Sequence, residues 1–321
     1  MREALFIKKN RDRWQTITHD EGKHPDEQAD DFIQLVEDLG YSKTFYPHSR
    51  ITQYLNKEAS KKYLNIYENS RESGNRFTRF FKYTLPETVG RHHRMLLVTF
   101  CLFITFVAIG FFSAKGEQTF VREVLGNSYV DMTEKNIQKG KPFEVYDDGN
   151  ELLMFIRIFI NNISVALHEF AGGILLGIPT VMSLVSNSIM VGTFEYLFYQ
   201  HGIIRDSVLT ILIHGTLELF SIVVSSTAGL VLATSWLFPR NKTRMDALKS
   251  GAKDGLIIAL SGFPTLLMAA FFEGFVTRHA DMPLWLKLVI VFSSLSFIIA
   301  YFIIYPIRLK QARRAAISAS V

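Results

Sequence analysis

Three ionisable side chains lie inside long apolar stretches of the sequence, where charged groups are rare. His214 and Glu218 both fall within the apolar run from Ser207 to Phe238, and Glu273 lies in a later one. A spacing of four residues places His214 and Glu218 on one helix face, stacked one turn apart. Ionisable groups at such depth in a bilayer cost about 2.5–3.5 kcal/mol each, so they normally face a protein interior or a water-filled cavity.

The rise of about 1.5 Å per residue along a helix estimates how deep each polar group lies in the membrane. On that estimate, one polar cluster occupies the outer half of the membrane and a second polar seam lies closer to the inner face. The two are therefore not expected to share a site. The expected cluster contains Glu195, His214, Glu218 and Glu273, and the expected seam contains Asn161, Asn162, His168 and Glu169.

Three functions compete for the cluster. The first is a buried hydrogen-bond network that fixes helix register or a dimer interface. The second is a proton or ion path, since intramembrane carboxylates and histidines commonly serve as relays. The third is a metal site with hydrolytic chemistry, with His214, Glu218 and Glu273 as ligands. The spacing lacks the second histidine of His-Glu-x-x-His, so we expect no metal, no cofactor and no catalytic residue.

Small and polar residues at other positions predict close helix packing or a cavity lining. Glycines four residues apart on one helix face allow two backbones to approach each other closely. An asparagine within an apolar run caps a broken helix or lines a cavity. These positions are Gly172, Gly173, Gly177, Asn187, Gly215 and Gly229.

Composition restricts the class of protein. The chain has 321 residues, of which 48% are hydrophobic, and after residue 94 the apolar residues gather into long runs. This pattern predicts an all-α, polytopic membrane protein. The net charge of +5 comes from Lys and Arg beside the apolar runs, which the positive-inside bias explains without nucleic-acid binding. A single cysteine, Cys101, excludes an internal disulfide.

About six transmembrane helices with both termini in the cytoplasm satisfy every cluster of basic residues. Two of the helices share the region 151–199, which breaks near a glycine pair, and a re-entrant hairpin is the competing interpretation. The fifth helix, from Gly255 to about Val276, is expected to kink or break near Pro264. The predicted organisation is a cytoplasmic helical domain at 1–94, a first transmembrane helix at 95–114, an extracytoplasmic segment at 115–150, a transmembrane bundle at 151–307 and a basic cytoplasmic tail at 308–321.

The N-terminal domain carries two helical stripes that are expected to form its core. Ser49 is expected to cap the second helix. At the end of the domain, His92 and His93 are expected to face lipid headgroups, and a helix is expected near 117–126 in the segment outside the membrane. The first stripe is Phe32, Ile33, Leu35, Val36 and Leu39, and the second is Ile51, Leu55, Ala59 and Ile66.

Nearly the whole chain resembles the stage II sporulation protein M family, in the broad form found beyond spore formers. The similar features are a basic start from Phe6 to Trp14, the helical segment Tyr54–Tyr67, Asn161-Asn162, the glycines at 172–177, Asn187 with Gly192, His214-Gly215 with Glu218, Gly229, and Phe272–Thr277. The chain departs from the family pattern at Ser188, where a second glycine is expected, and at Phe220, where a proline or small residue is common. Both departures affect the expected local backbone.

The resemblance implies a role in the cell envelope of bacteria. The sporulation member is associated with a membrane complex that controls peptidoglycan-degrading enzymes. We therefore expect a non-enzymatic scaffold that binds no nucleic acid and that assembles or anchors an envelope complex in the cytoplasmic (inner) membrane. Its expected partners are the lipid bilayer, a second copy of itself in a homodimer, and other envelope membrane proteins. The alternative is a channel or transporter whose polar path is lined by His214, Glu218 and Glu273.

Overall fold

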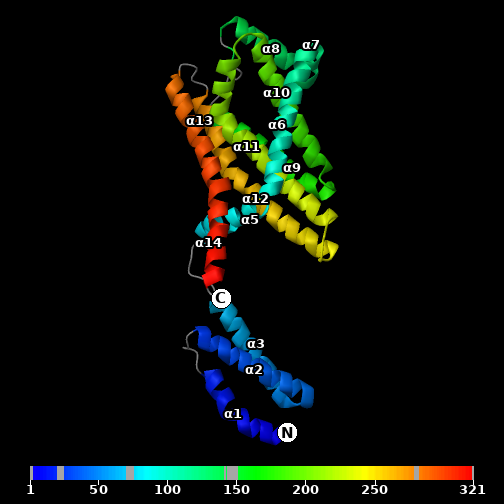
Figure 1. The fold of residues 1–321 in the computed structure, drawn as a ribbon, viewed down its shortest axis with the longest axis vertical. Helices are drawn as coiled ribbons and strands as arrows, with labels where there is room; N and C mark the ends of the chain where they lie inside the picture. Colours follow the sequence, from blue (N-terminus) through cyan, green and yellow to red (C-terminus); the bar gives the residue numbers. More distant parts are fainter. Residues whose placement is uncertain are drawn as a thin grey trace. The chain divides into compact units, whose positions relative to one another are not determined.

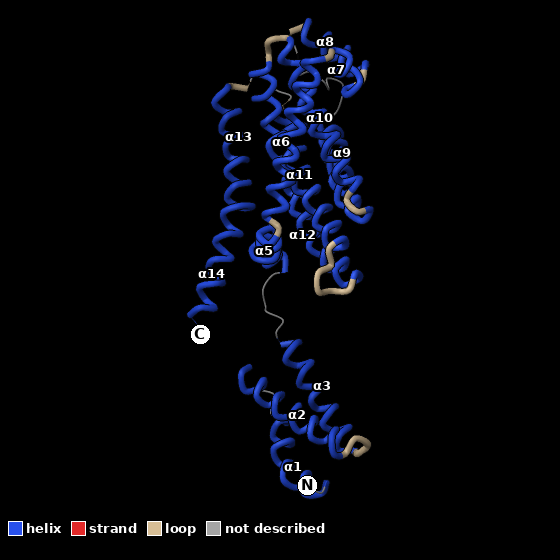
Figure 2. Tube along the Cα trace, turned by 45° about the vertical axis from the view of Figure 1, so that its right-hand side comes forward, coloured by secondary structure: helices blue, strands red, loops and turns tan. Residues whose placement is uncertain are grey.

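The computed structural model describes residues 3–19, 25–69, 76–140, 142, 151–277 and 282–319. Within these ranges the chain forms helices and no strands, and Figure 2 shows these helices joined by short loops. The predicted all-α class is confirmed. The chain divides into two compact units, Met1–Arg76 and Phe77–Val321. The first unit thus ends well before residue 94, the predicted domain end, because the residues after Arg76 pack with the membrane helices.

The N-terminal unit contains the helices α1 (Glu3–His19), α2 (Pro25–Phe45) and α3 (Arg50–Asn69) (Figure 1). Side chains from all three helices are buried together in one core. This core comprises Phe6, Trp14, Ile17, Leu35, Leu39, Leu55 and Ala59. The Trp14 indole Nε1 donates a hydrogen bond of 2.8 Å to Asp38 Oδ2, so the ring is fixed at its polar edge as well.

The predicted start of α3 is confirmed, but the predicted stripe on α2 is only partly buried. Ser49 Oγ accepts a 3.2 Å hydrogen bond from the Ile51 backbone N–H, as an N-cap does. Ile33 and Val36 are 53% and 43% exposed, because they lie beside the buried face rather than on it. The side chain of Ile66 lies outside the described residues.

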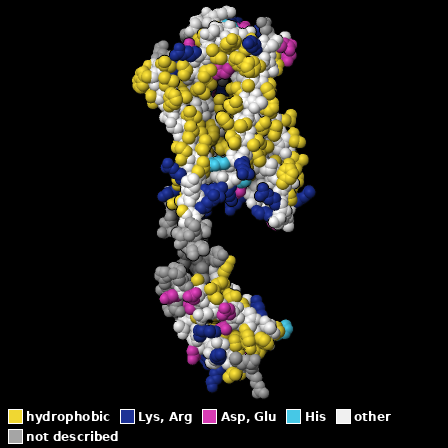
Figure 3. All heavy atoms as spheres, viewed as in Figure 1, with side chains coloured by type: hydrophobic (Ala, Val, Ile, Leu, Met, Phe, Trp, Pro, Cys, Tyr) yellow, Lys and Arg dark blue, Asp and Glu magenta, His cyan; other side chains and the backbone are white. Residues whose placement is uncertain are grey.

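The described residues of the membrane unit contain six helical segments long and apolar enough to cross a membrane. Figure 3 shows hydrophobic side chains across the middle of this unit and Lys and Arg gathered near the end where α5 and α14 lie. The segments are α6 (His93–Gly116), α9 (Glu151–Ala171) with the 3₁₀ turn η2 (Gly172–Leu175), α10 (Ile178–Gln200), α11 (Ile204–Leu237), α12 (Arg244–Phe271) with the π turn η3 (Phe272–Val276), and α13 (Leu284–Ile298) with the π turn η4 (Ile299–Ile304) and α14 (Tyr305–Ala319).

Region 151–199 forms two long helices, α9 and α10, rather than a short re-entrant hairpin. The chain reverses between them through Leu176 and Gly177, whose φ angles of 59° and 77° are left-handed. The expected break at Pro264 is absent, since α12 continues through that residue. The interruption lies instead at η3, nearer the end of the segment.

The segment between α6 and α9 contains α7 (Gln118–Leu125) and α8 (Asn127–Gln138). The helix predicted near 117–126 is confirmed, and α8 is an addition to it. Val121 of α7 and Val130 of α8 are buried against Tyr196 and Leu197 of α10. This contact joins the segment to one end of α10.

Backbone contact between α6 and α10 depends on glycines. A Cβ atom built on Gly110 would meet the backbone of Ile189, and one built on Gly192 would meet the backbone of Val107 and lie 2.8 Å from the Phe111 nitrogen. No other residue type fits at either position without separating the helices. The two helices therefore pack as a close pair.

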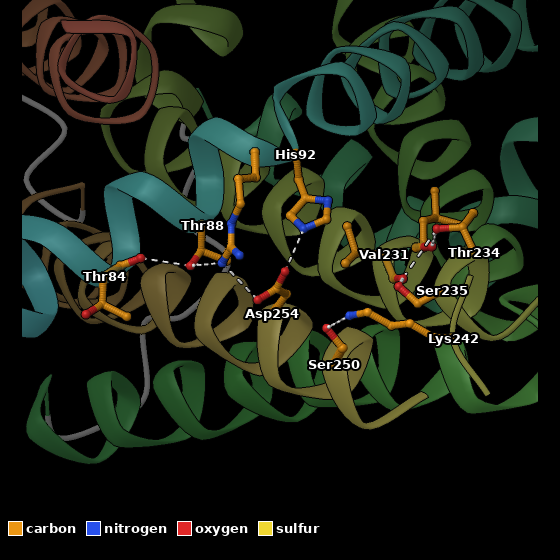
Figure 4. A network of polar contacts seen from close by, with 11 residues as sticks. Thr84, Thr88, His92, Val231, Thr234, Ser235, Lys242, Ser250 and Asp254 are labelled. Carbon is orange, nitrogen blue, oxygen red and sulfur yellow. Dashed lines mark hydrogen bonds and ion pairs between the residues drawn. The ribbon is translucent and has the colours of Figure 1, made fainter. Parts of the chain in front are cut away.

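The approach to the first membrane helix passes through α4 (Arg76–Arg79), the π turn η1 (Phe80–Thr84) and α5 (Leu85–Arg91). Asp254 of α12 contacts the residues just before α6: its carboxylate lies 3.0 Å from Arg91 Nη2 and 3.0 Å from His92 Nε2. Figure 4 shows His92 pointing toward Asp254. His93 Nε2 lies 2.8 Å from the Phe302 carbonyl oxygen. The headgroup-facing prediction for both histidines is therefore wrong, because each has a partner within the protein.

Candidate functional site

His214, Glu218 and Glu273 come together inside the membrane unit. Each side chain offers one ligand atom, a ring nitrogen or a carboxylate oxygen, and these atoms all lie within 4.8 Å of one another. All three side chains are partly buried. His214 and Glu218 come from α11 and Glu273 from η3, so the site joins two segments that are far apart in the sequence.

The hydrogen bonds of Thr277 determine which nitrogen of His214 carries a proton. Thr277 Oγ1 donates a 3.0 Å hydrogen bond to the Phe272 carbonyl oxygen. Thr277 Oγ1 also lies 3.2 Å from His214 Nδ1. Because Oγ1 already donates its own proton to the Phe272 carbonyl, it can only accept a hydrogen bond from Nδ1. The network thus assigns the proton to Nδ1 and leaves Nε2 with a free lone pair.

A π turn positions both Glu273 and Thr277. The Thr277 backbone N–H bonds to the Phe272 carbonyl at 2.8 Å, a bond that spans five residues instead of four. Such turns often occur at functional sites, where the extra residue redirects a side chain. Within the turn, a Cβ atom on Gly274 would lie 3.2 Å from the Phe155 Cβ, so the glycine lets α9 approach closely.

Asn162 of α9 lies beside Glu218. Its side chain is only 9% exposed. Its Oδ1 accepts a long hydrogen bond of 3.4 Å from Asn161 Nδ2, and its own Nδ2 is buried without a hydrogen-bond partner. The expectation that this asparagine belongs to a separate seam is therefore wrong. The depth estimate treated α9 and α11 independently, whereas the structure packs Asn162 against α11.

The cluster has little positive charge around it. Among the described residues, no Lys or Arg forms an ion pair with Glu218 or Glu273. Lys287 of α13 donates a 3.1 Å hydrogen bond to Thr210 Oγ1, one helical turn before His214. Two carboxylates in an apolar surrounding therefore have no protein cation to balance them.

Glu195 has a different partner. Its Oε2 accepts a 3.1 Å hydrogen bond from Ser207 Oγ, which joins the end of α10 to the start of α11. Glu195 is absent from the group of ligand atoms that His214, Glu218 and Glu273 form. Of the predicted cluster, the structure thus brings three members together and leaves the fourth apart.

Glu169 forms a second polar site, at the end of α9. Its side chain is fully buried, and Oε1 accepts hydrogen bonds of 3.3 Å from Ser183 Oγ and 3.4 Å from Asn187 Nδ2. Ser226 of α11 also lies beside it. The Thr180 hydroxyl donates a 2.6 Å hydrogen bond to the Glu169 carbonyl oxygen. Oε1 of this carboxyl group therefore has two neutral donors from α10, whereas its buried Oε2 has no hydrogen-bond partner.

Glycines bring the backbones together around Glu169. A Cβ atom on Gly173 would meet the carbonyl of Gly229, and one on Gly229 would meet the Glu169 carbonyl and lie 2.6 Å from Thr180 Oγ1. Gly177, expected on the same helix face, instead supplies the left-handed turn before α10. The single face predicted for these glycines is wrong, because the helix ends at Ala171.

The remaining predicted residues do not enter either site. Asn161 and His168 are exposed, about 100° around α9 from Asn162 and Glu169. Around Gly215, a Cβ atom would meet only side chains of its own helix, Ile211 and Leu219. Thr277 and Ser183 were not predicted, because a hydroxyl in a helix normally bonds to its own backbone and gives no signal.

Comparisons with known proteins divide the chain as the structure does. Residues 99–278, more than half of the chain, match the family model for stage II sporulation protein M. Residues 4–68 match a separate model, described as a domain of unknown function (DUF8413). No curated protein and no solved structure matches the chain. Residues 99–278 lie within the membrane unit, so the protein is a multi-pass membrane protein. The chain belongs to the stage II sporulation protein M family.

Proposed function

We propose that this protein assembles or anchors a cell-envelope complex and has no catalytic activity of its own. The observation that carries the proposal is the division into two modules. The N-terminal unit has its own three-helix core, and a separate family model matches it. A compact helical module attached to a membrane bundle suits a protein that connects a membrane assembly to partners outside the bilayer.

The exposed surface of α2 supports partner binding by the N-terminal unit. Ile33 and Val36 are three residues apart, on one face of the helix, and both are substantially exposed. Neighbouring exposed apolar side chains are typical of protein–protein contact sites. We infer that this face of α2 binds a partner subunit.

We place the protein in the bacterial cytoplasmic membrane with both termini inside, and we infer that it forms a homodimer. The basic end of the membrane unit supports the orientation, since Lys and Arg accumulate on the cytoplasmic side of membrane proteins. Basic residues lie around the start of α6, between α11 and α12, in the first half of α12 and in α14: Arg91, Arg94, Arg240, Lys242, Arg244, Lys249, Lys253, Arg308, Lys310, Arg313 and Arg314.

The test is gentle affinity purification from native membranes, followed by mass spectrometry and stoichiometry. We expect a stoichiometric envelope protein to copurify with the wild type and to be lost in Ile33→Glu/Val36→Glu. Lys57→Glu, which changes an exposed charge on α3, is the matched control and should retain the partner. A partner-free protein recovered from native membranes would contradict the proposal.

A channel or transporter is the second candidate, and the convergence of His214, Glu218, Glu273 and Asn162 favours it. Polar groups gathered between membrane helices commonly line a translocation path. A groove of about 480 Å³ between α11 and α13 has a lining of Ile204, Arg205, Val208, Leu209, Leu284 and Leu288, which includes none of these four residues.

Flux measurements in proteoliposomes test this candidate. A transport function predicts proton or ion flux that Glu218→Gln abolishes and Glu195→Gln, outside the cluster, leaves intact. Absence of flux under every imposed gradient, with correctly oriented protein, would exclude a transport function.

A further inference from the structure

We propose that His214, Glu218 and Glu273 bind a divalent transition-metal ion, with Zn²⁺ as the representative ion. The inference does not depend on the scaffold function, and it revises the expectation of no metal that the sequence alone supports. It rests on the ligand types, their spacing, the charge balance, the orientation of His214 and the buried amide of Asn162.

The ligand types suit a transition metal. Zn²⁺ binds imidazole nitrogen and carboxylate oxygen readily, and three protein ligands leave a fourth position for water. Ca²⁺ and Mg²⁺ favour sites made of oxygen atoms alone, so His214 selects against them. One imidazole and two carboxylates therefore favour Zn²⁺ or a similar first-row ion.

The spacing is close to that of a bound site. Ligand atoms about 2.1 Å from a tetrahedral ion lie roughly 3.4 Å from one another. The three ligand atoms here all lie within 4.8 Å of one another. Small side-chain rotations thus suffice to close them on an ion, without movement of α11 relative to η3.

Charge balance supports a dication. Two ionised carboxylates without a cation are very unfavourable in an apolar surrounding. In the described part of the chain, Glu218 and Glu273 have no Lys or Arg partner. A divalent ion bound to both carboxylates and to a neutral imidazole makes the site neutral overall.

His214 is already oriented for binding. A metal-bound histidine usually donates its other ring N–H to a neighbouring oxygen, which fixes the ring and its tautomer. Thr277 Oγ1 provides that oxygen for Nδ1, at 3.2 Å, and leaves Nε2 available. The π turn that carries Glu273 thus also supplies the group that orients the imidazole.

Asn162 provides an independent indication of a missing ligand. Its Nδ2 is buried beside the Glu218 carboxyl group and forms no hydrogen bond of normal length. A buried donor without a partner costs about 1–3 kcal/mol, so such atoms normally indicate an unseen water or ion. Water in the fourth position of the metal would accept this hydrogen bond.

The experiment measures zinc in the full-length protein, purified in detergent with a tag that contains no histidine. After loading with Zn²⁺ and gel filtration, we expect about one ion per chain in the wild type. Glu218→Gln and Glu273→Gln should lose it, while Glu195→Gln should retain it. X-ray absorption of the bound zinc should show one imidazole with oxygen ligands.

Thermal unfolding separates the proposal from a metal-free network. If the site binds zinc, Zn²⁺ raises the Tm of the wild type and of Glu195→Gln but not that of Glu218→Gln or Glu273→Gln. Zinc content at background, or equal zinc content in all four proteins, would overturn the proposal. So would a Tm that Zn²⁺ leaves unchanged in the wild type.

Discussion

Two acidic sites inside the membrane unit have opposite surroundings. Glu169 is the single carboxyl group of its site and is fully buried; its Oε1 accepts hydrogen bonds from Ser183 and Asn187, while its Oε2 has no hydrogen-bond partner. Glu218 and Glu273 lie together, are partly buried and share one imidazole. The first site thus holds a single carboxyl group against neutral donors, whereas the second brings two carboxyl groups together with no Lys or Arg partner among the described residues.

This difference separates a structural role from a binding role. Hydrogen bonds between polar groups of neighbouring helices, such as those of Glu169 with Thr180, Ser183 and Asn187, fix how those helices pack. A buried pair of carboxylates without a cation is unfavourable unless something else binds there. Glu169 therefore belongs to the packing of α9, α10 and α11, whereas the pair at Glu218 and Glu273 is prepared for a ligand.

The largest predicted effect disrupts the packing around Glu169. In Gly229→Ala, the new methyl group would lie 2.6 Å from Thr180 Oγ1 and 2.8 Å from Thr180 Cγ2. We expect a loss of about 3 kcal/mol in the free energy of unfolding, because the contacts are with a tightly packed helix. Denaturation in detergent measures it.

Gly116→Ala is the matched control, because a Cβ atom there meets nothing within 4 Å. It should change stability by less than about 0.5 kcal/mol. Equal stability of the two variants would show that the close packing of Gly229 is not required.

The second prediction compares two substitutions of Glu169. Glu169→Leu leaves the Ser183 hydroxyl without its acceptor, removes one of the acceptors of Asn187 Nδ2, and should cost about 2 kcal/mol. Glu169→Gln keeps an acceptor oxygen and should cost less than about 1 kcal/mol. Thermal unfolding distinguishes them. Zinc binding should survive in Glu169→Gln but not in Glu218→Gln, and its loss in both would mean that the two sites are not separate.

The smallest predicted effect concerns the orientation of His214. Thr277→Val keeps the shape of the side chain but removes the oxygen that binds Nδ1. We expect Zn²⁺ affinity to fall at least about tenfold, as for other losses of a group that orients a metal ligand. Competition with a zinc indicator measures the affinity.

Thr216→Val is the control for that measurement. Thr216 Oγ1 donates only to the Leu212 carbonyl of its own helix, at 2.7 Å, so this variant should bind zinc as the wild type does. An unchanged affinity in Thr277→Val would remove the role assigned to Thr277.

The sequence correctly predicted that His214, Glu218 and Glu273 lie together, but it also added Glu195 and left out Asn162. The spacing of His214 and Glu218 and the depth of Glu273 were enough to place the three together, because straight helices convert sequence distance into depth. Asn162 was not predicted to join them. Its position depends on how α9 packs on α11 beside Gly274, and depth along one helix carries no information on that contact.

The sequence predicts the membrane helices, whose positions depend on the length of apolar runs, but it does not predict where the helical backbone is irregular. The membrane helices follow from runs of apolar residues. The π turn at Phe272–Val276 and the contact of His92 with Asp254 do not, because both depend on contacts between distant parts of the chain. These same contacts position Glu273 and the entry to α6.

The glycine contacts between α6 and α10 also have a consequence for the insertion of these two helices into the membrane during synthesis. Gly110 and Gly192 bring the two helices into backbone contact, yet α7, α8 and α9 are made between them. Of the six membrane segments, α6 has the highest mean hydropathy and α10 the lowest. The ribosome thus delivers first the helix that is stable alone in lipid, and α10 inserts when its partner is already present.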